Sequence, residues 1–156
     1  AKNAPFDTVE EARLVAGVTD EVWETFGENL SVHTKNYKVN VNSASADMIV
    51  ALLRAFTDPS VMSYEFLVEA TMMLMIERAT MPGPFTNAKN FMQRVEGRGV
   101  VFANANARST LQGLVTTKSR VFKLSATGYV NDSTSTVEAT VRVNRSSIKM
   151  LEWRER

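Results

Sequence analysis

Few side chains in this chain of 156 residues could carry chemistry. His33 is the only histidine, and the chain has no cysteine. Multi-histidine metal sites, thiolate zinc sites, disulfides and cysteine nucleophiles are therefore excluded. The sequence also lacks the GxSxG, Walker and GxGxxG motifs of hydrolases and nucleotide-binding enzymes. We expect His33 to be a surface loop residue, and the sequence favours a non-enzymatic protein.

Carboxylates are concentrated near the N-terminus, at Asp20, Glu21, Glu24 and Glu28. Spacings of three and four residues place several of them on one face of a helix. General acid–base chemistry needs two carboxyl groups in different environments within a cleft, and the neighbouring sequence gives no sign of one. We interpret these residues as a solvated acidic face that could contact a basic partner protein. The alternative is a periplasmic enzyme or lectin-like module, which would require a deep pocket holding two carboxylates.

The segment 131–135 (NDSTS) is rich in side-chain oxygen atoms that could bind a cation. A calcium loop usually supplies several carboxylates, whereas this segment holds only Asp132. We therefore expect no cofactor here.

The segment LVAGVTDEVWETF has the outline of a helix-hairpin-helix, a module that binds nucleic acid. In DNA-binding versions, a Gly-apolar-Gly hairpin directs backbone N–H groups at a phosphate. Here the hairpin reads Gly17-Val18-Thr19, so the second glycine is missing. The acids that follow, Asp20 and Glu21, would repel a phosphate. Nucleic-acid binding, for example in DNA uptake, is therefore the alternative function rather than the favoured one.

Composition and charge are those of a globular protein, with 44% hydrophobic and 22% charged residues. The net charge of +1 is unevenly divided, because residues 1–60 carry nine acids and five bases while residues 97–156 carry four acids and ten bases. This asymmetry indicates two differently charged lobes or, equally well, two solvated faces. No apolar run approaches the roughly 18 residues that a membrane-spanning helix needs.

Hydrophobic periodicity predicts a helical domain over residues 1–98. Thr19 and Ser63 can cap helices, as can Asn42, Ser43 or Ser45, and Gly17 suits a left-handed helix end. The expected helices span 8–15, 20–30, 64–79 and 87–96. A further helix is expected between 30 and 64, with an apolar stripe from Met48 to Phe56 and its end at Asp58-Pro59.

The helix expected over residues 64–79 is apolar nearly all round in its second half, so we expect that half to be buried. Most of the methionines in the chain lie in or near it, and we expect them to pack in the core: Met62, Met72, Met73, Met75 and Met81. Earlier in the chain, Val39 and Val41 alternate with polar residues, which predicts an extended connector before the helix that contains Met48 to Phe56.

The last third of the chain, residues 99–156, changes to a period of two. Runs beginning at Phe122, at Thr136 and at Ile148 predict three strands separated by polar turns, an antiparallel meander with one wet face. Between residues 99 and 119 we expect a strand or loop and then a short helix around Arg108 to Leu114. Helices followed by strands indicate the α+β class.

Several segments, taken in order, resemble one known family. PFDTVEEARLVAGVTDEVW and KVNVNSASADMIVALL are similar to the helical part of the general secretion pathway protein K family, the large minor pseudopilins of type II secretion systems. VTTKSRVFKLSATGYV is similar to the strand after the helical insert of this family, and IKMLEWRER to its terminal strand. The matching residues in the first two segments are Pro5, Phe6, Val15, Gly17, Val18, Thr19, Asn40, Val41, Asn42, Ala44 and Ser45.

The resemblance implies a helical domain of the SAM-like or helix-hairpin-helix-like kind, followed by a pseudopilin-type antiparallel sheet. The implied function is to cap the tip of the type II secretion pseudopilus and so take part in protein export. The implied partners are the other minor pseudopilins, of the I and J types, with the secreted cargo or the outer-membrane channel as further contacts. The resemblance makes calcium a plausible cofactor, but its ligands cannot be assigned in this sequence.

Members of this family begin with a hydrophobic helix that anchors them in the inner membrane, and this chain does not contain one. We therefore expect a C-terminal fragment of a longer protein at the periplasmic face of the inner membrane of a Gram-negative bacterium. The resemblance predicts that the sheet, without its missing partner, is left partly uncovered. A minor pilin of a related fibre system would share this outline.

Overall fold

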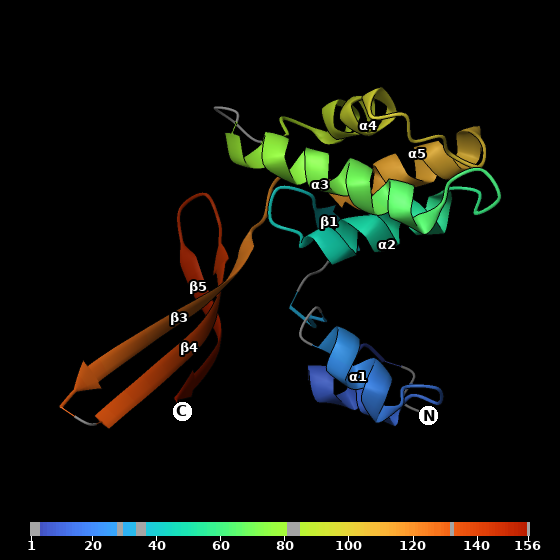
Figure 1. The fold of residues 1–156 in the computed structure, drawn as a ribbon. Coiled ribbons are helices and arrows are strands. Elements are labelled where there is room, and N and C mark those ends of the chain that lie inside the picture. Colours follow the sequence, from blue (N-terminus) through green and yellow to red (C-terminus); the bar gives the residue numbers. More distant parts are fainter. Residues whose placement is uncertain (1–3, 28–29, 34–36, 81–84, 132, 156) are drawn as a thin grey trace. The chain divides into compact units, whose positions relative to one another are not determined.

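The computed structural model describes residues 4–27, 30–33, 37–80, 85–131 and 133–155 (Figure 1). These residues form six helices and a three-stranded antiparallel sheet, which confirms the α+β class. The chain divides into two compact units. Unit 1 combines residues 1–36 with residues 120–156, and unit 2 comprises residues 37–119. The domains expected from the sequence, 1–98 and 99–156, divide the chain differently, and their boundary lies within unit 2.

Unit 2 is a helical unit closed by a short pair of strands. In chain order its elements are β1 (Val39–Asn40), α2 (Ala46–Phe56), α3 (Tyr64–Thr80), α4 (Ala88–Gly97), α5 (Ala105–Leu114) and β2 (Val115–Thr116). Each helix begins where a polar side chain accepts a hydrogen bond from a first-turn backbone N–H, as free helix ends require. These capping residues are Ser45, Ser63, Asn87 and Asn104.

The helices of unit 2 enclose one hydrophobic core. The fully buried side chains come from all four helices, from β2 and from Val41, which directly follows β1. They include Val41, Ile49, Leu53, Leu67, Leu74, Phe91, Met92, Val95, Leu111 and Val115. Phe85 and Phe91 meet edge to face, with ring centroids 5.1 Å apart. Each large side chain in such a core contributes about 1.5–3 kcal/mol by leaving water.

The segment Asn40-Val41-Asn42 connects distant parts of unit 2. β1 is extended, as expected, but it pairs in parallel with β2, with Val39 opposite Val115. Asn40 donates to Ser119 Oγ at 2.7 Å, and its own side-chain oxygen accepts from the backbone N–H of Asn42 at 3.0 Å. Asn42 donates to the backbone carbonyls of Phe85, at 3.0 Å, and Thr117, at 3.1 Å. The asparagines therefore satisfy backbone groups in three separate segments.

Helix α3 differs from its expected burial. Leu74 is fully buried, and Met62 and Met75 pack against the core, but Met72, Met73 and Ile76 are 51%, 46% and 60% exposed. The expectation that the whole second half of this helix is buried is therefore wrong for one face. Its neighbours α2 and α4 cover only the opposite face. Met81 lies outside the described residues.

Unit 1 begins with two short helices, η1 (Val9–Leu14) and α1 (Asp20–Phe26). Thr19 caps α1 as expected, because its hydroxyl accepts from the N–H of Val22 at 3.3 Å. Both helices are shorter than the sequence pattern suggests, and η1 is a 3₁₀-helix rather than an α-helix. The hairpin between them turns at Gly17, whose φ of 94° lies in the left-handed region.

Replacing Gly17 by valine should destabilise unit 1 by about 1 kcal/mol or more, because a side chain strains the left-handed backbone. Space is not the cause, since nothing lies within 4 Å of the position where a Cβ would be. Gly97, which has equally open surroundings and no such φ, supplies the control variant Gly97→Ala. Thermal melts of the two variants and the parent chain would check this, and an unchanged melt for Gly17→Val would contradict the hairpin conformation.

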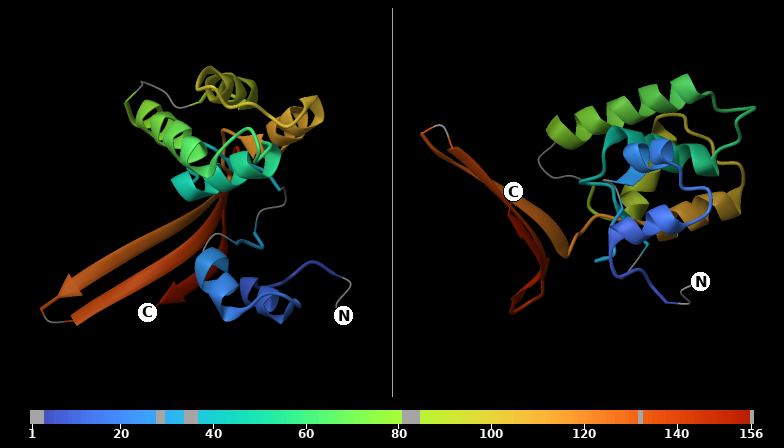
Figure 2. Two further views of the ribbon diagram at one scale, coloured as in Figure 1. Left: turned by 45° about the vertical axis from the view of Figure 1, so that its right-hand side comes forward. Right: turned by 90° about the horizontal axis from the view of Figure 1, so that it is seen from below.

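The sheet of unit 1 is the expected meander of β3 (Val121–Val130), β4 (Ser133–Val143) and β5 (Ile148–Glu155). Asn131 adopts a φ of 51° at the first turn, and the N–H of Asn144 donates to the carbonyl of Ser147 across the second, at 2.8 Å. Only residues 137–143 of β4 pair with β5. The β3–β4 hairpin therefore extends beyond β5 as a two-stranded ribbon (Figure 2).

The two faces of the sheet differ in character. The pairing register brings six apolar side chains together on one face, which we call the apolar face. They are Phe122, Leu124, Ala139, Val141, Met150 and Trp153. Its central residues on β4 are buried, but Phe122 and Leu124 are 43% and 53% exposed, and Met150 and Trp153 are 55% and 56% exposed. The opposite, polar face carries charged and hydroxyl side chains. The sequence predicted that only one face of the sheet would contact solvent, but in the structure the apolar face is partly exposed as well.

None of the described helices is both long and apolar enough to cross a bilayer.

Candidate functional site

Unit 1 contains a cleft of about 700 Å³ between its N-terminal segment and the polar face of the sheet. The N-terminal segment contributes apolar side chains to it, among them Val9, Trp23 and Leu30. The sheet contributes polar ones, among them Lys123, Glu138, Thr140, Glu152 and Arg154. Its volume is within the range of small-molecule sites.

The polar face exists because β4 alternates strictly. Val137, Ala139 and Val141 point to one side of the strand, so Glu138 and Thr140 point to the other. On this face Lys123 of β3 forms an ion pair with Glu138, at 3.6 Å.

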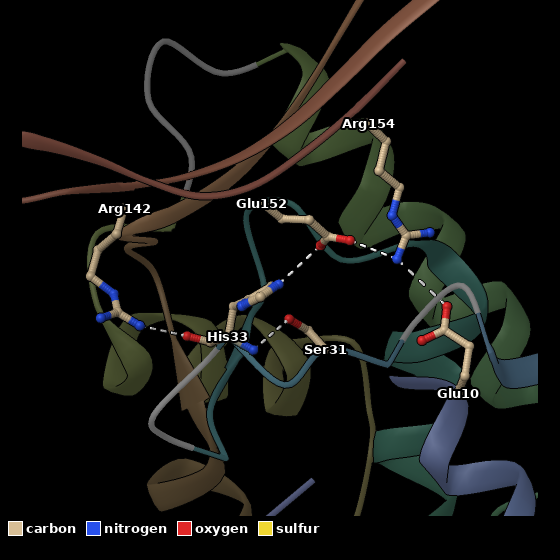
Figure 3. A network of polar contacts seen from close by, with 6 residues as sticks. All are labelled: Glu10, Ser31, His33, Arg142, Glu152 and Arg154. Carbon is tan, nitrogen blue, oxygen red and sulfur yellow. Dashed lines mark hydrogen bonds and ion pairs between the residues drawn. The ribbon is translucent and has the colours of Figure 1, made fainter. Parts of the chain in front are cut away.

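A chain of polar contacts joins the N-terminal segment to the sheet (Figure 3). His33 Nε2 lies 3.0 Å from Glu152 Oε2, and Arg154 contacts the other oxygen of Glu152 at 2.6 Å. Arg154 also lies 3.6 Å from a carboxylate oxygen of Glu10 in η1. Finally, Arg142 donates to the backbone carbonyl of His33 at 2.9 Å. We call these five residues the clamp.

The clamp carboxylates favour the ionised form. The hydrogen bond from His33, assisted by the positive charge of Arg154, lowers the pKa of Glu152. A backbone hydrogen bond, with help from Arg154, lowers the pKa of Glu10. The carboxylate of Glu152 in turn raises the pKa of Arg154. A general acid needs a raised pKa, so Glu10 and Glu152 suit ion pairing better than proton donation.

The histidine and carboxylate of the clamp also resemble the base and orienting acid of a nucleophilic enzyme. In the part of the chain that the structure describes, however, no serine or threonine hydroxyl bonds to the His33 ring. Ser31 Oγ instead accepts from the backbone N–H of His33, at 3.2 Å. The pair therefore holds the segment around His33 against β5.

The other residues singled out in the sequence do not gather in this cleft. Asp20 forms an ion pair with Arg13 at 2.6 Å, and Glu24 lines the cleft wall. Glu28 and Asp132 lie outside the described residues. No group of three or more histidine, aspartate or glutamate side chains among the residues described could hold a metal ion.

His33 lies in a loop, as expected, but its side chain is partly covered, with 24% exposed. Glu152 is 119 residues away in the chain. No local pattern signals that contact, so sequence reasoning missed the clamp.

Acid should loosen the clamp, and the sign follows from the lowered pKa values. A carboxyl group whose pKa is lower in the folded state stabilises that state at pH values above its usual pKa, which is near 4.5. This contribution is lost as the pH falls through the lowered pKa. Neither η1 nor α1 contains a buried residue, so their docking depends strongly on these polar contacts. We expect the N-terminal segment to detach as the pH falls below the usual carboxyl pKa near 4.5 and through the lowered pKa values of Glu10 and Glu152.

The fluorescence of Trp23, which lines the cleft, would report this detachment in a Trp153→Phe background, because the chain has two tryptophans. Glu152→Gln should weaken docking at neutral pH and flatten the acid transition. Glu65→Gln, an exposed acid of unit 2, should leave the transition unchanged. A transition equally steep in Glu152→Gln and the parent would contradict the role of the clamp.

Comparison of the chain with protein-family models, with curated proteins and with solved structures found no match.

Proposed function

We propose that this chain is the soluble part of a minor pseudopilin of the general secretion pathway protein K kind, which caps the tip of a type II secretion pseudopilus. The mechanism is steric and interfacial, with no bond made or broken. The ordered resemblance of the helical segments and the terminal strands suggests this function, and the resemblance and the architecture together support it.

The observation that carries the proposal is the open apolar face of the sheet. Four large side chains on that face, Phe122, Leu124, Met150 and Trp153, are each more than 40% exposed. Clusters of exposed apolar side chains mark surfaces that pack against another element or protein. A pseudopilin whose anchoring helix and fibre neighbours are absent would leave such a face open.

The arrangement of the chain supports the capping role. The helical unit 2 is a single insertion of 83 residues, from Tyr37 to Ser119, into the unit that carries the sheet. A unit of this size attached to a fibre-forming sheet would prevent the addition of further subunits above it.

On this proposal the partners are the I-type and J-type minor pseudopilins, and contacts with secreted cargo or the outer-membrane channel follow from a position at the tip. The full-length protein would be anchored in the inner membrane by an N-terminal helix, with the residues described here in the periplasm. Calcium binding, which the resemblance makes plausible, would be part of the same proposal.

The test is a pull-down of this chain with the soluble domains of the two partner pseudopilins from the same genome, with a DNA gel shift at low salt alongside. Binding to the partners without a shift is the expected result. Trp153→Ser should weaken that binding, whereas Tyr129→Ser, at an exposed aromatic of the hairpin ribbon, should not. A shift without partner binding would favour the nucleic-acid alternative, and absence of both would count against the capping role.

A further inference from the structure

The uncovered face of α3 is a second unusual surface, separate from the sheet. A helix places residues 65, 69, 72, 76 and 80 within about 100° of one another, together with residue 73. These residues, Glu65, Glu69, Met72, Met73, Ile76 and Thr80, are all exposed, and we call them the α3 face. An exposed helix face with three large apolar side chains at its centre is typical of a helix that packs against a partner.

The charges around the α3 face are arranged by position along the helix. Its N-terminal half carries two acids, Glu65 and Glu69, and neither forms an ion pair with another described residue. Beside its C-terminal half, Glu77 pairs with both Arg94 and Arg98. Glu77 therefore shares its single negative charge between Arg94 and Arg98, and both guanidinium groups lie at this end of the α3 face.

A groove of about 400 Å³ lies at the basic end of the α3 face. It is lined by Met73, Ile76, Glu77, Thr80 and Arg98. Glu77 is largely buried, with a side chain 10% exposed, but Arg98 retains 35% exposure and so can contact a further carboxylate.

The α3 face of one copy is complementary to the α3 face of a second copy that is related to it by a two-fold rotation. The midpoint between Met72 and Met73 lies 7.5 residues, or roughly 11 Å along the helix, from both Glu65 and Thr80. If two copies of α3 cross antiparallel at that point, Met72 of one copy faces Met73 of the other. Glu65 of each copy then faces Thr80 of the other, and Glu69 faces Ile76. Both Thr80 and Ile76 line the same groove as Arg98. Such an arrangement is an isologous interface, in which the same patch serves both copies.

We infer that the α3 face binds a second copy of this chain, with the two α3 helices antiparallel across a two-fold axis between Met72 and Met73. The apolar centre supplies the contact area, and the acid end of each helix pairs with the basic end of the other. This inference does not depend on the proposed function. A single helix pair buries less surface than a standard interface of about 1,600 Å², so we expect a weak dimer whose population rises with protein concentration.

Sedimentation velocity of the whole chain over about a hundredfold range of concentration would measure this association. The parent should shift from monomer to dimer, and added salt should weaken the shift because ion pairs contribute to it. Ile76→Glu, which places a charge at an exposed central position, should reduce the association about tenfold or more. Its far-ultraviolet circular dichroism should match that of the parent.

A charge exchange tests the antiparallel geometry. Glu69→Arg should weaken the dimer, because it removes one of the two acids of the N-terminal half and places a positive charge opposite the basic end of the other copy. Adding Arg98→Glu to that variant should restore the association. Glu21→Arg, an equal change of charge on α1 of unit 1, should have no effect on association. A chain that stays monomeric over the whole range would overturn the inference. So would a dimer insensitive to Ile76→Glu but lost in Trp153→Ser, because the apolar face of the sheet would then be the interface.

Discussion

Replacing Leu74 by alanine should lower the free energy of unfolding of unit 2 by about 2–5 kcal/mol. Leu74 is fully buried at the centre of α3, within the core that α2, α4 and α5 complete. Truncation removes its transfer free energy and leaves a cavity, because neighbours in a close-packed core collapse only partly.

The neighbouring residue Met73 provides the matched control. It is 46% exposed, although it lies on the same helix and is of similar size. Met73→Ala should change stability by less than about 0.5 kcal/mol. Urea unfolding followed by circular dichroism at low protein concentration would compare the two, since unit 2 holds the four longest helices. Equal losses in both variants would show that both faces of α3 are buried in solution, contrary to the structure.

Asn42→Ala is the second change with a large expected effect, about 2–4 kcal/mol. Its side-chain amide is the donor to the carbonyls of Phe85 and Thr117, at 3.0 and 3.1 Å. Both acceptors belong to segments remote in sequence, so the loss would leave partly buried carbonyls without that donor. An unpaired buried polar group costs about 1–3 kcal/mol.

Asn106→Ala supplies the control for this prediction, because Asn106 is an exposed asparagine in the first turn of α5. It should be nearly neutral in the same urea titration. Hydrogen exchange would add a second readout, since Asn42→Ala should speed exchange around β1 and β2, which the asparagine holds together. An effect of Asn42→Ala no larger than that of Asn106→Ala would mean that solvent replaces its hydrogen bonds.

The sequence predicted those features that depend on near neighbours. Thr19, Ser45 and Ser63 cap helices because a hydroxyl reaches an N–H two or three residues later, and such a contact is local. The strands of the meander were predictable for the same reason, since their period of two and the polar turns between them can be read along the chain.

Contacts between distant segments were not predictable. The parallel pairing of Val39 with Val115 and the bond between His33 and Glu152 join residues far apart in the chain, with no local pattern that signals them. The burial of α3 was mistaken for a related reason. An apolar helix is expected to bury its faces against other elements. The sequence of the helix does not show whether those elements belong to the same chain or to a partner.

The pairing of β1 with β2 also bears on the order of folding. These strands lie at the two ends of unit 2, and the bond from Asn40 to Ser119 closes it further. Everything that unit 2 needs is therefore present once Ser119 has been synthesised, whereas unit 1 must wait for β3, β4 and β5 before Glu10 and His33 find their partners. Domains fold as units during synthesis, so unit 2 should form first. Because its two ends pair with each other, the folded unit 2 should then keep the two halves of unit 1 close in space. For the same reason, a short linker in place of unit 2, residues 37–119, should still allow unit 1 to assemble.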